Sequence, residues 1–494
     1  MKAVNENRVN ELLMGLAEFG KTDQGVTRLA YSDEDRAAQN WLLAQVADLG
    51  LEMREDAVGN VFLRRKGEDD TLPAVATGSH LDTVIHGGMY DGMCGVVGAL
   101  EALYMLKDVK LKRSVEVIIF RAEESSRFGF ATIGSKLMSG NGSPEGFSKA
   151  AKKGELSYIE ALANWGCDPA NYKEAIVKPG TYKSFSEIHI EQGKVLEETG
   201  KQVGIVHNIA APTRFKIHIK GMADHSGATP MGFRRDALVS GAKLILAVEA
   251  AATEEKDNGT VGTVGVVDVE PSSINVVPGG VTLWVDVRGV NNESIARTLE
   301  MIKEAAYNVA QDDKVRIDIE MLTADKPVAL SEELAKKAEA ICEAEGIDYL
   351  HMNSGAGHDA MHMAKLAPTT MIFIPCKEGI SHNPAEFAKL EDICRAVNVL
   401  SKLIEAEANE KYNVENKKEA RKCFLNFYTP VPSKVGINSA QAASSSWTKP
   451  SSIPLSIKYC SISAYSSAVT LRLISGNSAA RPQGTYWCIR LNIT

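Results

Sequence analysis

Features of membrane, secreted and zinc-finger proteins are missing from this sequence. No apolar run approaches the roughly 18 residues of a membrane-spanning helix, and the first ten residues, MKAVNENRVN, lack the apolar segment of a signal peptide. We therefore expect a cytoplasmic protein with no membrane partner. The eight cysteines are scattered without a CxxC pair, which argues against a disulfide framework and against a cysteine-type zinc site.

Basic charge is scarce over most of the chain. The net charge is −8, but residues 411–494 hold eleven Lys or Arg against two Asp or Glu, so they carry +9 and residues 1–410 carry −17. Such an acidic body argues against nucleic acid as the main partner. What the chain does contain is a 44% apolar fraction over 494 residues, enough for the cores of two or three domains.

Apolar patterning predicts an α/β fold interrupted by a second domain. Short buried strands alternate with helical spacing over the first two hundred residues, which indicates a sheet with mainly parallel strands. From residue 213 the pattern becomes strand–helix–strand–strand–helix–strand, typical of a compact two-layer α+β unit. We expect a mixed-sheet catalytic domain with a smaller α+β domain inserted in it. The predicted boundaries are 1–211 and 327–410 for the catalytic domain, and 212–326 for the insert.

The remaining segment, residues 411–494, differs in composition from the rest. It holds fourteen serines and three of the eight cysteines, and no apolar period is sustained along it. We expect this tail to be poorly ordered and to contribute nothing to catalysis. An origin in a shifted reading frame or an abnormal terminus is a hypothesis for its composition.

The stretch GSHLDTVIHGGMYDG, residues 78–92, carries the first chemical signal. His80 and Asp82 are two residues apart at the end of a predicted strand, so their side chains point to the same side. Histidine binds zinc-like metals while a carboxylate often holds its other ring nitrogen, and Asp82 is placed for that role. Asp91 precedes a helical pattern, where a carboxylate can bridge two cations. The alternative is a capped helix beside a surface histidine.

Four further segments offer metal-ligand or proton-transfer groups after predicted strands. The adjacent carboxylates of Glu123 and Glu124 repel each other unless a cation neutralises them. With a dinuclear metal, Glu124 could bind an ion while Glu123 takes a proton from bound water. Taken singly, a Glu-Glu pair is more often solvated, and a lone histidine is more often a satisfied core residue. The other three segments are HIEQG with His189 and Gln192, Gly357-His358-Asp359, and ISHNP with His382.

Considered together, these segments predict a metal centre that hydrolyses its substrate. Ligands bind beyond the carboxyl ends of the strands in sheets of this kind. Three histidines and two carboxylates suit zinc, manganese or cobalt better than calcium. Paired ions bridged by one carboxylate lower the pKa of a water molecule and stabilise a tetrahedral intermediate. The five predicted ligands are His80, Asp91, Glu124, His189 and His382.

In order and spacing, the motifs resemble one enzyme family. GSHLDTV, YDG, the Glu-Glu pair, HIEQG, DHSGATPM, SGAGHDAM and ISHNPAEF are similar to those of dinuclear-metal amidohydrolases. This family contains N-carbamoyl-L-amino-acid hydrolases, β-ureidopropionase and allantoate amidohydrolase, within the superfamily of metallo-aminoacylases and carboxypeptidases. The resemblance covers residues 5–410. Peptidase relatives usually have a carboxylate at the position of His189, so this histidine favours the carbamoylase branch. Ser125 departs from the glycine of most relatives.

The resemblance implies a role for each residue of the metal centre. It implies two divalent ions, Zn²⁺, Mn²⁺ or Co²⁺, one held by two histidines and the other by a histidine and a carboxylate, with a bridging carboxylate between them. Asp82 would orient a metal-binding histidine, and Glu123 would be the general base that later protonates the leaving amine. The implied ligands are His80 and His189 for one ion, Glu124 and His382 for the other, and Asp91 as the bridge.

The resemblance also implies that the inserted domain is a lid and dimerisation domain. His225 of its DHSG motif would reach the active site of the partner subunit in a homodimer and stabilise the oxyanion. Arginine suits a free carboxylate and an amide side chain can bind both ends of a polar substrate. The implied substrate contacts are Gln192, Asn275, Arg288, Gly357 and His358. The remaining histidines, 86, 207, 218, 351 and 362, are interpreted as structural.

We therefore expect an amidohydrolase acting on a small ureido acid, with an N-carbamoyl-L-amino acid yielding the amino acid, ammonia and carbon dioxide. Allantoate amidohydrolase is the nearest alternative, because it uses the same machinery on a substrate with a ureido group at each end. β-Ureidopropionase and a metallo-aminoacylase or peptidase are further alternatives. A non-catalytic, metal-stabilised binding protein would be expected to lose Glu123 before its metal ligands.

Overall fold

The computed structural model describes residues 1–148 and 156–410. The expectations for residues 411–494 therefore concern a segment outside the described residues. Within the described ranges, no helix combines the length and the apolar content needed to cross a membrane.

The larger sheet is mixed, as the sequence predicts. Within the described residues it has nine strands, in the order β15-β8-β17-β7-β5-β6-β4-β3, with β16 paired to β8. The central strands β17, β7, β5 and β6 run parallel, whereas β8 and β4 run antiparallel to their neighbours β17 and β6. The strands are β3 (Glu52–Glu55), β4 (Val61–Arg65), β5 (Ala74–His80), β6 (Val115–Phe120), β7 (Tyr182–Ile190), β8 (Val203–Ile209), β15 (Val328–Ala329), β16 (Tyr349–Ser354) and β17 (Thr369–Ile374).

Helices cover both faces of this sheet, so its central strands are buried on both sides, as parallel strands usually are. Five long helices pack over one face, and the short helices α4 and α11 lie on the other. The long helices are α1 (Glu6–Ala17), α2 (Asp33–Gln45), α3 (Met93–Leu106), α10 (Glu332–Glu345) and α12 (Leu390–Asn409). The shorter ones are α4 (Ile133–Met138), α5 (Pro144–Phe147), α6 (Tyr158–Trp165), α7 (Val195–Thr199) and α11 (Ala360–Met363).

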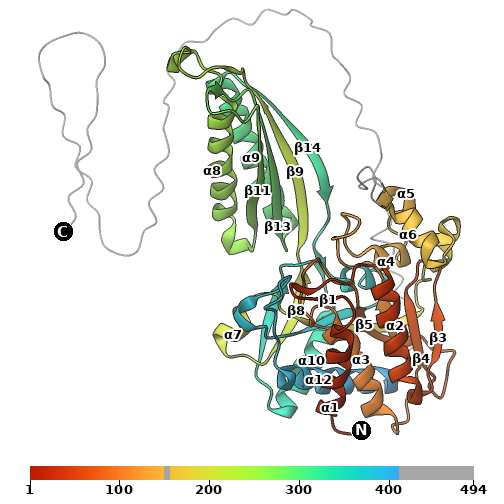
Figure 1. The fold of residues 1–494 in the computed structure, drawn as a ribbon. Coiled ribbons are helices and arrows are strands. Elements are labelled where there is room, and N and C mark those ends of the chain that lie inside the picture. The colour runs from red at the N-terminus through yellow and green to blue at the C-terminus, as the bar shows by residue number, and fades with distance from the viewer. Residues whose placement is uncertain (149–155, 411–494) are drawn as a thin grey trace, which may run out of the picture. The chain divides into compact units, whose positions relative to one another are not determined.

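A second, four-stranded antiparallel sheet has its own apolar core. Its order is β11-β13-β9-β14, and α8 and α9 run side by side along one face (Figure 1). Buried and half-buried residues alternate along β9, so one face packs on the helices. We call these elements the four-stranded unit: β9 (Ala211–Lys220), α8 (Ala237–Glu254), β11 (Val261–Glu270), β13 (Gly280–Gly289), α9 (Asn292–Asp313) and β14 (Arg316–Ala324).

The observed elements differ from the predicted ones near the candidate site. The strand predicted before His80 includes this residue, so His80 is the last residue of β5. Strands β8 and β16 were not predicted, and they pair in parallel at one side of the sheet. The strand–helix–strand–strand–helix–strand order of the four-stranded unit is as expected. The domain boundaries themselves stay a prediction.

Candidate metal centre

His80 stands at the carboxyl end of β5 with its ring fixed by the main chain. Its Nδ1 lies 3.0 Å from the carbonyl oxygen of Asp82. A carbonyl only accepts, so the proton is on Nδ1 and the lone pair of Nε2 faces the site. That buried Nε2 has no hydrogen-bond partner among the described residues.

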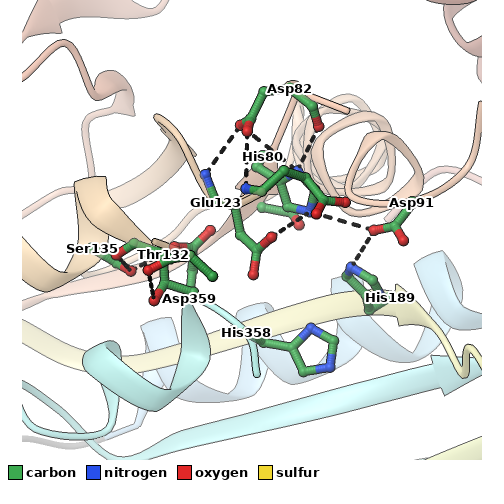
Figure 2. A network of polar contacts seen from close by, with 12 residues as sticks. His80, Asp82, Asp91, Glu123, Thr132, Ser135, His189, His358 and Asp359 are labelled. Carbon is green, nitrogen blue, oxygen red and sulfur yellow. Dashed lines mark hydrogen bonds and ion pairs between the residues drawn. The ribbon is translucent and has the colours of Figure 1, made fainter. Parts of the chain in front are cut away.

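Asp91 lies between His80 and His189 (Figure 2). Its Oδ1 is 3.5 Å from Nε2 of His80 and 3.1 Å from Nε2 of His189. His189, at the end of β7, has its Nδ1 2.9 Å from the carbonyl oxygen of Ile190, so its Nε2 also presents a lone pair. Two lone pairs facing one carboxylate repel unless a proton or a metal cation lies between them.

The second carboxylate oxygen of Asp91 faces another pair of groups. His382 Nε2 is 3.4 Å from Asp91 Oδ2 and 3.3 Å from Oε1 of Glu124. Asp91 therefore shares one oxygen with the two strand-end histidines and the other with His382, the arrangement of a bridging carboxylate. Geometrically, two groups of possible metal ligands meet at this residue: His80, Asp91 and His189 in one, and Asp91, Glu124 and His382 in the other.

Three of the four histidine–carboxylate distances fit metal ligation better than direct hydrogen bonding, whereas the 3.1 Å between His189 and Asp91 also fits a hydrogen bond. Bonds of 2.0–2.2 Å to a tetrahedral ion place neighbouring ligand atoms about 3.3–3.6 Å apart, whereas direct N–H···O bonds are about 2.7–3.2 Å long. The distances from Asp91 to His80 and from His382 to Asp91 and Glu124 fall in the ligand range. Together with the unpartnered Nε2 of His80, they show a donor set suited to divalent ions.

Without a cation, the charges of the cluster shift each other's pKa strongly. Burial alone would lower the pKa of His80, but Glu123 and Asp91 raise it well above its usual value. Burial would raise the pKa of Asp91, yet His189 and His382 hold it well below its usual range. Such opposed shifts are typical of functional sites.

Glu123 is placed to exchange protons beside the ligands. Its carboxylate lies 3.8 Å from Nε2 of His80, and within the described chain no hydrogen bond fixes that carboxylate (Figure 2). Burial raises the pKa of Glu123 well above its ordinary range, although His80 lowers it. A carboxyl group with a raised pKa is better suited to accept a proton and return it near neutral pH.

Asp82 acts on the cluster differently from the expectation. Its carboxylate is 3.9 Å from Nδ1 of His80, and the main-chain carbonyl of Asp82 makes the close contact instead. The carboxylate accepts hydrogen bonds from the backbone N–H groups of Glu123, at 3.2 Å, and Glu124, at 3.0 Å. Asp82 therefore orients the histidine through its backbone and the Glu-Glu pair through its side chain.

A buried shell of acids was missed from the sequence. Glu386 Oε1 accepts the backbone N–H groups of Tyr90 and Asp91, and Ser381 donates to both Asp91 and Glu386. Burial, with the charge of Asp91, raises the pKa of Glu386 to about 7. These contacts fix the backbone that carries the bridging residue.

Two other buried acids lie around the histidines. Glu187 accepts from Ser79 at 2.8 Å, and Asp359 accepts from Ser135 at 2.5 Å. Glu187 is two residues before His189 on β7 and thus on the same face, so its place in a buried strand was an available signal. For Asp359, the signal in the sequence was its place directly after His358 in the Gly357-His358-Asp359 motif.

The backbone is strained at several positions of this centre. Ala122, Gln192 and His382 have positive φ angles of 56°, 57° and 55°. Non-glycine residues rarely adopt this conformation, and such strain clusters at functional sites. Each of the three is itself in, or next to, the candidate site.

Among the predicted substrate contacts, Gln192 and His358 lie at the cluster. Gln192 Nε2 donates to Asp91 Oδ2 at 2.7 Å. The ring of His358 meets that of His189 edge-on, 4.5 Å between centroids, and Ser354 Oγ lies 2.8 Å from its Nε2. Burial, followed by His189, lowers the pKa of His358 well below its usual value, so this imidazole is neutral. Gly357 directly precedes it in the chain.

The structure does not bring His225, Asn275 or Arg288 to the metal ligands. His225 is exposed, and its Nδ1 accepts the backbone N–H of Gly227 at 3.0 Å, which places the ring proton on Nε2. The backbone N–H of Ser226 donates to the Asn275 carbonyl, because β10 (Asp224–His225) pairs with β12 (Val276–Val277). Arg288 is held by Asp286 at 2.9 Å. The roles of these three residues stay predictions.

Comparison with known proteins identifies the family of this chain. A family model described as Peptidase family M20/M25/M40 matches residues 68–406, which include the five candidate ligands. The ureidoglycolate hydrolase of Arabidopsis thaliana is 40% identical over 80% of this chain and 84% of its own length. The N-carbamoyl-L-amino acid amidohydrolase of Geobacillus stearothermophilus is 38% identical over 80% of this chain and 97% of its own length.

Two further relatives extend the comparison. The allantoate amidohydrolase of Escherichia coli is 34% identical over 80% of this chain and 96% of its own length. A solved amidase of the hydantoinase/carbamoylase family from Burkholderia multivorans superposes with a TM-score of 0.75 at 33% identity, covering 83% of this chain and 99% of that one. By the extent of these matches, the chain belongs to peptidase family M20/M25/M40.

Proposed function

We propose that this protein is a metal-dependent amidohydrolase that cleaves the linear C–N bond of a small ureido acid. The observation that carries the proposal is the arrangement around Asp91. Three imidazole nitrogens and the carboxylate of Glu124 surround its two oxygens, and Glu123 lies beside them without a structural hydrogen bond among the described residues. Hydrolases and amidohydrolases are the named activities of the relatives.

In this proposal, each residue has a defined task. Two divalent ions, Zn²⁺, Mn²⁺ or Co²⁺, would lower the pKa of a bound water and polarise the ureido carbonyl. His80 and His189 would hold one ion, Glu124 and His382 would hold the other, and Asp91 would be a ligand of both. Glu123 accepts the proton of the attacking water and returns it to the leaving nitrogen. The carboxylate of Asp82 keeps Glu123 in place by accepting the backbone N–H of Glu123.

Substrate recognition is assigned to residues from both sheets. Arg288 would bind the substrate carboxylate, while Asn275, Gln192, Gly357 and His358 contact its polar ends. His225 would donate its Nε2–H to the oxyanion, and the observed acceptor role of its Nδ1 supports that tautomer. Closure of the four-stranded unit as a lid would exclude water.

A homodimer is part of the same proposal, because it would let His225 act in the partner's site. Strand β11 is an edge strand of the four-stranded unit, and it exposes three valines. An edge strand with exposed apolar side chains is a ready surface for pairing with a second copy. The valines are Val261, Val266 and Val267, with exposed fractions of 59%, 48% and 41%.

Two substrate classes fit the site. An N-carbamoyl-L-amino acid is the first, supported by the likeness to carbamoylases and by a histidine at position 189. Allantoate or ureidoglycolate is the second, favoured by the 40% identity to a ureidoglycolate hydrolase. Both present a ureido group and a carboxylate, so the same residues serve either.

Ammonia release separates these possibilities. Protein loaded with Zn²⁺, Mn²⁺ or Co²⁺ is assayed with carbamoyl amino acids, carbamoyl-β-alanine, allantoate and ureidoglycolate. We expect turnover of at least one, with a kcat fall of about 10²–10⁴-fold in Glu123→Gln at unchanged metal content. A Glu123→Gln variant as active as the parent would contradict the proposal, and so would full activity after exhaustive chelation.

A further inference from the structure

Two histidines interpreted from the sequence as structural meet around one carboxylate away from the candidate metal centre. His207 lies on β8, His351 on β16 and Glu339 on α10, and one potential ligand atom from each lies within 4.8 Å of the others. The two rings are stacked, with centroids 4.8 Å apart. None of these residues belongs to the cluster around Asp91.

The separations in this trio are those of metal ligands. Nε2 of His207 and Nε2 of His351 lie 3.6 Å and 3.5 Å from the same oxygen, Oε1 of Glu339. Both distances exceed a direct N–H···O bond of about 2.7–3.2 Å. They match the separation of about 3.3–3.6 Å between neighbouring ligands of a tetrahedral ion with bonds of 2.0–2.2 Å.

Two of these atoms are buried and lack a hydrogen-bond partner among the described residues. They are Nε2 of His207 and Oε1 of Glu339. Leaving such atoms unpaired costs free energy, so native proteins rarely tolerate it. The two nearest lysines in sequence pair with other acids: Lys337 lies 2.8 Å from Glu333, and Lys336 lies 2.7 Å from Glu332.

The backbone holds the trio in register. β8 and β16 are parallel neighbours, with His351 opposite Ile205, two residues from His207. The carbonyl of His207 accepts the backbone N–H of Leu330, the residue after β15, at 2.8 Å. Because α10 packs on β8, Glu339 comes to the two histidines without a loop having to move.

We propose that His207, Glu339 and His351 form an additional divalent-cation site of the zinc type. Two imidazoles and one carboxylate suit Zn²⁺, Co²⁺ or Ni²⁺, and water would complete the coordination. The ion would link β8, β16 and α10, and its role is structural, since no proton-transfer group of the candidate active site is among its ligands. The site does not depend on which ureido acid the protein cleaves.

A matched control exists within the chain. His218 also faces a glutamate, but its Nε2 lies 2.9 Å from Glu320 and its Nδ1 lies 3.2 Å from Thr282 Oγ1. Both ring nitrogens are thus satisfied by ordinary hydrogen bonds. Removing His218 deletes a histidine–glutamate pair without deleting a metal site.

The test is the zinc content of the full-length protein after equilibrium dialysis against a zinc buffer. We expect His351→Ala and Glu339→Gln each to bind about one ion fewer per chain than the parent, and His218→Ala to match the parent. His351 is 59% exposed on its side chain, so its removal leaves the core intact. Equal zinc content in the parent, His351→Ala and Glu339→Gln would overturn the proposal and leave the trio as an ion pair.

Cobalt provides a second readout that isolates this site. In a background carrying both His80→Ala and His382→Ala, which removes one ligand of each catalytic ion, Co²⁺ should still give a d–d absorption spectrum, and most of it should be lost on adding His351→Ala. A spectrum unchanged by that added substitution would also overturn the proposal. Because neither measurement uses ammonia release, failure of the proposed hydrolysis would leave both results interpretable.

Discussion

A Cβ atom on Gly92 would lie 2.5 Å from both Nε2 and Cε1 of His80. Gly92 also has a φ of 69°, in the left-handed region that favours glycine. The chain therefore passes against the His80 ring directly after Asp91, and this approach is open only to a residue without a side chain. The positions of the Asp91 carboxylate and of the His80 ring depend on the same glycine.

Replacing Gly92 by alanine should disable the metal centre. The methyl group would displace the His80 ring, and we expect metal affinity to fall at least 10–100-fold, with activity lost in parallel. Gly50→Ala is the control, because Gly50 has a φ of 63° but nothing lies within 4 Å of the place that its methyl group would take. Isothermal titration calorimetry with Zn²⁺ measures the metal affinity of both variants. A metal affinity of Gly92→Ala equal to that of Gly50→Ala would contradict the account that the contact with His80 requires a glycine at position 92.

Glu386 should support metal binding without touching the ion. It accepts the backbone N–H groups of Tyr90 and Asp91, so Glu386→Ala would leave two buried donors unpaired. We expect a 10–100-fold loss of metal affinity in Glu386→Ala. Glu386→Gln keeps an oxygen acceptor and should recover part of it. Metal titration of both variants measures this, and identical losses would mean that the charge, rather than the hydrogen bonds, is what matters.

The five candidate ligands could be predicted because each lies at the end of a strand, in the segment that follows a strand or just before a helix, where side chains gather beyond the carboxyl ends of parallel strands. The acid that holds the backbone of Asp91 could not. Glu386 is surrounded by sequence that allows a solvated carboxylate equally well, and only the folded structure shows that it is buried. Burial is a property of contacts between distant segments, which local pattern does not record.

Pairing between distant segments explains the other omissions. Strand β16 has few fully buried residues, and its partner β8 is more than a hundred residues away in the chain. Its alternation is therefore weak, and a structural interpretation of His207 and His351 was the natural one. The four-stranded unit was predictable, because its strands alternate clearly and its helices lie between consecutive strands.

A buried ion pair behind the Glu-Glu segment should contribute strongly to stability. Arg121, two residues before Glu123, donates to Asp35 at 2.6 Å, and both side chains are inaccessible to solvent. Asp35→Ala would leave the guanidinium buried without its carboxylate partner, although it keeps its hydrogen bonds to Gly59 and Gln39, and this should lower the free energy of unfolding by about 3–5 kcal/mol. Lys303→Ala, which breaks the exposed pair with Glu300, should change it little. Urea denaturation compares the two, and equal midpoints would contradict this account.

Metal affinity should rise with pH, because protons and cations compete for the same nitrogens. Hydrogen bonds to Asp91 and Glu124 raise the pKa of His382 to about 10, so without a metal its imidazole is protonated at neutral pH. A nitrogen must lose this proton before it can bind an ion. Each pH unit between about 6 and 8 should therefore strengthen affinity up to about tenfold for every proton displaced.

Calorimetry in two buffers of different ionisation enthalpy counts those protons directly. Binding to the parent should release protons at pH 7, and His382→Ala should release fewer while binding more weakly. The sign follows from the raised pKa: a ligand that is protonated at neutral pH releases its proton on binding, whereas one with a depressed pKa would release none. Metal binding that is independent of pH, with no proton release, would mean that another group neutralises Asp91 and that His382 is not a ligand.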